Sequence, residues 1–133
     1  MSEFSKIETY VLLNQKDSNL WLGKVDLSQA DLTGVNLQDA FLGGANFSDT
    51  TLVDANLGMA NLTRSNLKGV DLTGAFLCGA KLVEANLSFA ILESANMEGA
   101  ILTEADLYDA KLIETILKNA DLLVVADCVP ITY

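Results

Sequence analysis

Two glutamates are the side chains whose spacing comes nearest to that of a catalytic pair. Glu84 and Glu104 occupy the same place in a five-residue repeat, four repeats apart. Two carboxylates held close together can share a proton or bind a cation. Arg64 takes the same place four repeats before Glu84, and a positive charge there favours an ionised carboxylate. We therefore interpret the two glutamates as solvated surface side chains.

The remaining composition lacks the side chains on which most enzyme sites depend. The chain has no histidine, which removes histidine-based acid–base catalysis, catalytic triads and histidine metal ligands. The two cysteines, Cys78 and Cys128, have no metal-binding spacing, and we interpret them as free thiols in a reducing cytoplasm. The sequence predicts no enzyme, no cofactor and no metal site.

A five-residue repeat organises the chain from Leu20 to Leu122. The middle residue of each repeat, here called the centre, is Leu at 19 of 21 positions, with Phe47 and Met97 as the exceptions. Two residues before each centre lies the small place, which is most often Ala. The outward place lies between them, and the first and second corner places follow the centre. All nine glycines occupy corner places, so none belongs to a phosphate-binding loop.

A period of five fits neither an α-helix nor a long strand. The small place and the centre alternate with the outward place, as inward and outward side chains do in a strand segment of three residues. Glycine tolerates the positive φ that some tight turns require, which accounts for its place at the corners. Short strands that alternate with corners must coil into a solenoid, and repeats of fixed period are typical of that architecture.

The repeat A(D/N)LXX resembles that of the pentapeptide-repeat family, and the resemblance covers about 103 of the 133 residues. It implies an all-β fold, a right-handed quadrilateral β-helix with four pentapeptides per coil, and thus about five coils here. The short, uninterrupted form resembles small cyanobacterial members, most of which have no assigned activity. Members that protect DNA gyrase from quinolones share the fold, and some of them carry projecting loops. This chain has no insertion inside its repeat.

The chain divides into residues 1–19, 20–124 and 125–133. We expect residues 1–19 to cap the first coil, with a helix over about 3–14 or a strand over Glu8–Leu13. Residues 20–124 form the solenoid, and the apolar tail 125–133 either covers the last coil or meets a second molecule. With four repeats per coil, Trp21 and Phe41 should stack. Asn46, Asn66 and Asn86 should form a side-chain amide ladder.

The net charge of −10 makes direct binding to nucleic acid or to an anionic membrane unfavourable. The first residues contain no apolar segment typical of a signal peptide. The longest apolar run, Leu122–Ala126, is far shorter than a membrane span. We therefore expect a cytoplasmic protein.

Four repeats per coil give four sides, which we number in chain order from those centred on Leu22, Leu27, Leu32 and Leu37. Acidic residues concentrate on the second and third sides, where nine acids face two lysines for a net charge of −7. A DNA mimic that occupies a protein such as DNA gyrase is therefore the alternative function. B-DNA of ~25 Å carries about 15 negative charges, twice as many. The nine acids are Asp26, Asp31, Asp49, Asp54, Asp71, Glu93, Asp106, Asp109 and Glu114.

Large apolar residues appear at outward and corner places near the C-terminal end of the third side. Contiguous apolar patches are typical of contact sites, and we call this set the C-terminal patch. It predicts a protein-interaction scaffold that binds an unknown protein partner or a second copy, tail to tail about a two-fold axis. The C-terminal patch consists of Phe89, Ile91, Tyr108, Ile113 and Ile116.

Overall fold

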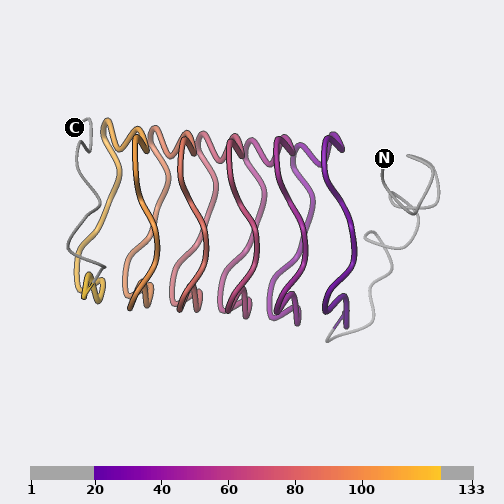
Figure 1. The fold of residues 1–133 in the computed structure, drawn as a ribbon. Helices are drawn as coiled ribbons and strands as arrows, with labels where there is room; N and C mark the ends of the chain where they lie inside the picture. Colours follow the sequence, from indigo (N-terminus) through magenta and orange to yellow (C-terminus); the bar gives the residue numbers. More distant parts are fainter. Residues whose placement is uncertain (1–19, 124–133) are drawn as a thin grey trace.

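Parallel bridges every 20 residues set the path of the chain in the computed structural model, which describes residues 20–123. Each outward residue pairs with its counterpart 20 residues later, from Trp21–Phe41 to Ile101–Asp121. Because 20 residues are four pentapeptides, every coil has four sides. The described residues make five coils and the start of a sixth, stacked in a row from the indigo end to the yellow end (Figure 1).

Backbone hydrogen bonds follow one rule along the stack. The outward N–H donates to the previous coil, and the N–H groups of the centre and the second corner place donate to the next coil. The Leu42 N–H, for example, donates to the Asn61 carbonyl at 2.8 Å. The N–H of the small place closes the preceding turn, as Val25 does with Leu22 at 3.3 Å. Four of the five N–H groups of a repeat thus have backbone partners.

The bridged part of each side is shorter than the three-residue strand segment that the sequence predicts. Within residues 20–123 the bridges are isolated and lie only at outward places, from Trp21 to Asp121. The reason is that the small residue uses its N–H to close the preceding corner, and the next corner begins directly after the centre. These described residues contain no helix, and therefore none that could cross a membrane.

Every corner has the same backbone shape. The second corner place has a positive φ, from 53° at Asp109 to 70° at Gly34, as the third residue of a type II turn requires. Six glycines and 14 other residues occupy this place. The remaining glycines, Gly23, Gly43 and Gly58, lie at the first corner place, where a positive φ is not needed. The prediction that glycines occupy the corners because a positive φ is required there therefore holds for six of the nine glycines.

The core is a column of centres enclosed by small residues, as the register predicts. Leu72 and Ala80 are completely buried, and Phe47 is accommodated in the same column. Thr50, at a small place, is also buried, and its hydroxyl is satisfied because it donates to the Leu27 carbonyl at 2.8 Å. Burial ends at the last coil, where Leu122 is 44% exposed. The predicted N-terminal cap and the tail 125–133 lie outside the described residues.

Candidate interaction surfaces

Asp and Asn side chains at the outward place also stabilise the turn that follows them, which the polar character of these residues did not by itself predict. All 12 Asp or Asn side chains at described outward places accept a hydrogen bond from the N–H two residues later, at 2.9–3.2 Å. That donor belongs to the first corner place, which is the one N–H of the repeat without a ladder or turn partner. Aspartate and asparagine favour such local turns. The (D/N) of the repeat therefore completes the backbone hydrogen bonding.

This bond changes the interpretation of the two acidic sides. All nine predicted acids lie on the outside of the second and third sides, but four of them occupy outward places and direct an oxygen to their own turn. The pKa of Asp26 is lowered chiefly by its hydrogen bonds with Ser28. The five acids at corner places are Asp49, Asp54, Glu93, Asp109 and Glu114. The acidic surface is therefore partly engaged in holding the corners.

Glu84 pairs with Arg64 and not with Glu104. The Arg64 Nε lies 2.8 Å from Glu84 Oε2, and a second guanidinium nitrogen lies 3.3 Å from Oε1. Hydrogen bonding by Arg64 lowers the pKa of the Glu84 carboxyl. The pair is well exposed, and no group of three or more metal-ligating side chains occurs among residues 20–123. The geometry agrees with the interpretation of solvated glutamates.

The C-terminal patch contains an aromatic pair. Phe89 and Tyr108 lie on one corner in successive coils, with ring centroids 5.6 Å apart and planes at 79°, a favourable edge-to-face geometry. Lys68 extends this column, with Nζ 5.8 Å from the Phe89 centroid. Ile91 is half-buried. The four other members of the patch are 41–49% exposed: Phe89, Tyr108, Ile113 and Ile116.

Two predicted stacks of side chains have different outcomes. The stack of Trp21 on Phe41 is confirmed, with ring centroids 4.5 Å apart and planes tilted by 33°. Of the amide ladder the structure shows the first rung, in which Asn46 Nδ2 donates to Asp26 Oδ1 at 3.2 Å. The Oδ1 atoms of Asn46, Asn66 and Asn86 accept from their own turns instead. A turn bond does not by itself exclude a rung, because Asp26 Oδ1 accepts both from the Ser28 N–H and from Asn46 Nδ2.

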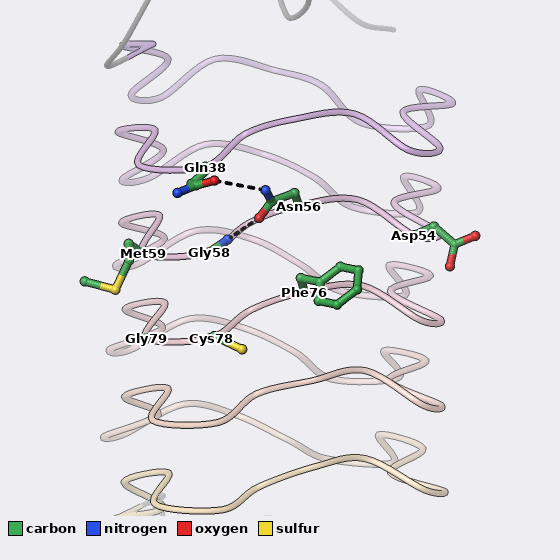
Figure 2. Close-up of a pocket in the computed structure, with 8 residues that line it drawn as sticks. All are labelled: Gln38, Asp54, Asn56, Gly58, Met59, Phe76, Cys78 and Gly79. Atoms are coloured by element: carbon green, nitrogen blue, oxygen red, sulfur yellow. Dashed lines mark hydrogen bonds between the residues drawn. The ribbon is translucent and has the colours of Figure 1, made fainter.

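The fourth side carries a groove that the sequence analysis did not predict. The groove is open, with a volume of about 640 Å³. Figure 2 shows Phe76 between Met59 and Asp54, with the Gln38 and Asn56 amides above it. One sequence signal does exist, since Phe76 replaces the usual Asp or Asn at an outward place. The lining residues are Gln38, Asp54, Asn56, Gly58, Met59, Phe76, Cys78 and Gly79.

Four sides per coil, leucine centres and positive-φ corners define a quadrilateral β-helix built from five-residue repeats. The family model of pentapeptide repeats matches residues 18–49, 45–82, 60–99 and 80–119. These ranges cover most of the chain, which therefore belongs to the pentapeptide repeat family. The right-handed coil is the form implied by its structural neighbours. A comparison with curated protein sequences found no match.

Solved structures share the fold. A pentapeptide repeat protein of Nostoc PCC 7120 is 30% identical, with 89% of this chain and 87% of that chain covered and a TM-score of 0.61. One from the Arabidopsis thaliana thylakoid lumen is 33% identical, with 67% and 66% covered and a TM-score of 0.57. QnrB1, a plasmid-mediated fluoroquinolone resistance protein, is 20% identical, with 77% and 55% covered and a TM-score of 0.50. This last similarity concerns the fold alone.

Proposed function

We propose that this protein is a non-catalytic interaction scaffold that binds a protein partner, or a second copy of itself, through the C-terminal patch. The observation that carries the proposal is the exposure of Phe89, Tyr108, Ile113 and Ile116 at one end of one side. Large apolar side chains exposed together are typical of contact surfaces, whereas single ones are normal on any protein. The aromatic pair adds rigid contact area at little entropic cost.

The last coil also presents a backbone edge at the end where the C-terminal patch lies. The centre N–H groups donate toward the next coil throughout the stack, so the last coil directs the N–H groups of Leu112 and Leu117 toward the C-terminal end. The carbonyl groups of small places such as Ala110 and Thr115 point to the same end, because small-place carbonyls accept from the following coil throughout the stack. Because donors and acceptors alternate along this edge, a tail-to-tail dimer could pair its backbones as well as join its C-terminal patches.

The test is the molar mass measured by light scattering over a range of protein concentrations, with affinity capture on the same proteins. The variant Ile91→Glu/Ile113→Glu should lose the dimer or the captured partner, because charge is placed in an apolar contact. Ile101→Glu/Val83→Glu is the matched control, since these residues occupy the same places of the repeat on the opposite side. A parent that is monomeric and captures nothing would contradict the proposal, as would equal losses in both variants.

The acidic DNA mimic remains the alternative function, and it rests on the nine acids of the second and third sides. Four of those acids direct an oxygen to their own turns, and these bonds leave the net charge of −7 unchanged, at about half that of an equal length of B-DNA. A gyrase supercoiling assay tests this alternative. Inhibition at micromolar protein that is weakened by neutralising Asp31, Asp54 and Asp71 would favour the mimic over the scaffold.

A further inference from the structure

The groove on the fourth side has an apolar floor at places that are usually polar. Phe76 is 54% exposed and Met59 is 59% exposed, and Cys78 lies beside them, half-buried. Twelve of the 21 outward places hold Asp or Asn, whereas Phe76 presents an aromatic ring. Exposed apolar side chains gathered in a concave site favour binding of a complementary group.

One wall of the groove is held by side-chain hydrogen bonds. Asn56 Nδ2 donates to Gln38 Oε1 at 3.1 Å, and Asn56 Oδ1 accepts from the Gly58 N–H at 3.0 Å (Figure 2). Both ends of the Asn56 amide are therefore engaged. Gly58 and Gly79 add no side chains to fill the space. The wall is thus formed before any ligand binds, which lowers the entropic cost of binding.

The charge in the groove is negative. Asp54 is exposed, and its carboxylate lies against Gly74 in the next coil, in space that a side chain on Gly74 would take. No lysine or arginine lines the groove, and among residues 20–123 no ion pair involves Asp54. A carboxylate and an aromatic ring that line the same groove are together complementary to a cation with an apolar stem.

We infer that this groove binds a single basic side chain of a partner protein, with arginine preferred over lysine. The aliphatic stem packs on Met59 and Phe76, and the guanidinium lies on the Phe76 ring within reach of Asp54. Arginine is preferred because its planar head stacks on an aromatic face and pairs with a carboxylate at the same time. The groove would then be a second contact site, two coils from Ile116 of the C-terminal patch.

The test is an NMR titration of the ¹⁵N-labelled protein with N-acetyl-arginine amide. The amide signals of Gly58, Cys78 and Gly79 should shift and saturate in the millimolar range, as expected for one side chain. N-acetyl-citrulline amide has nearly the same shape without the charge and should leave these signals unchanged. The two sources of binding, charge and apolar contact, are then separated by variants of the protein.

Asp54→Asn and Phe76→Asn should each weaken binding by about two- to fivefold. Both variants should fold, because Asn tolerates a positive φ and occupies other outward places of this chain. Asp49→Asn is the matched control: Asp49 has a φ of 55° against 56° for Asp54, and it lies against Gly69 as Asp54 lies against Gly74. The inference fails if Asp49→Asn weakens binding equally, if citrulline amide shifts the same signals, or if the signals near Asp49 and Asp54 shift alike.

Discussion

Gly34 is the residue at which the cost of a positive φ at the second corner place can be measured without a steric clash. Its φ is +70°, and a Cβ built there would meet no atom within 4 Å. Gly34→Ala should therefore destabilise the fold by about 1 kcal/mol through backbone strain alone. Gly43 is the control, because its φ is not positive and its added Cβ would make an ordinary 3.6 Å contact with the Thr63 carbonyl. Chemical denaturation of both variants measures the difference, and equal stabilities would contradict the assigned turn.

The Arg64–Glu84 pair predicts a dependence of stability on pH. Hydrogen bonding by Arg64 lowers the pKa of Glu84 in the folded state below its ordinary value of 4.5. A depressed carboxyl pKa adds stability that is present above the unfolded value and is lost as the pH falls through the folded value. Glu84→Gln should therefore reduce the loss of thermal stability below about pH 4.5.

The effect of this variant should be small, because both side chains are well exposed. Glu104→Gln is the control, since it removes a carboxylate from the same place one coil later. Melting curves recorded between pH 7 and pH 3 compare the three proteins. If Glu104→Gln changes the pH dependence as much as Glu84→Gln does, the hydrogen bond from Arg64 is not the cause.

At the scale of one coil, substitutions in the core test which residues of the repeat face inward. Leu72→Ala should cost about 2–5 kcal/mol, because the side chain is completely buried between coils that cannot close over a cavity. Ala80→Leu should also destabilise, since the small place has room for a small side chain only. Denaturation midpoints measure both effects. A variant that unfolds like the parent would show that its residue is not in the core.

The sequence predicts most of each coil because one repeated pattern determines burial, corner position and stacking. Leu72, Ala80 and the Trp21–Phe41 pair all lie where the register places them. Periodicity does not reveal which acceptor satisfies a given N–H, so the turn bonds of the outward Asp and Asn residues were missed. It also did not reveal that 14 residues other than glycine have a positive φ.

The candidate sites are less predictable than the coil. The C-terminal patch was found because its residues interrupt a polar pattern within two coils. The groove was missed because it combines Gln38, Asn56 and Phe76 from three successive coils with two corners. Its wall includes glycine corners and side-chain hydrogen bonds that a residue pattern does not show. The predicted helix over 3–14 and the tail 125–133 lie outside the described residues.

At the scale of the whole molecule, the solenoid presents different chemistry along its length. The Trp21–Phe41 stack lies at one end, the groove spans the first three coils, and the C-terminal patch lies toward the other end. A rod of this kind can hold separate contacts in fixed positions, because each coil is bonded to the next through every side. The architecture is therefore compatible with the proposed scaffold.

The central claim, that the C-terminal patch is an interface, is tested most directly by hydroxyl-radical footprinting with residue-level mass spectrometry. The free protein is compared with the protein in its dimer or with its captured partner. Phe89, Tyr108, Ile113 and Ile116 should become protected, whereas the exposed Trp21 and Phe41 should react as before. Unchanged oxidation of the patch in the complex, or protection confined to Trp21 and Phe41, would contradict the account.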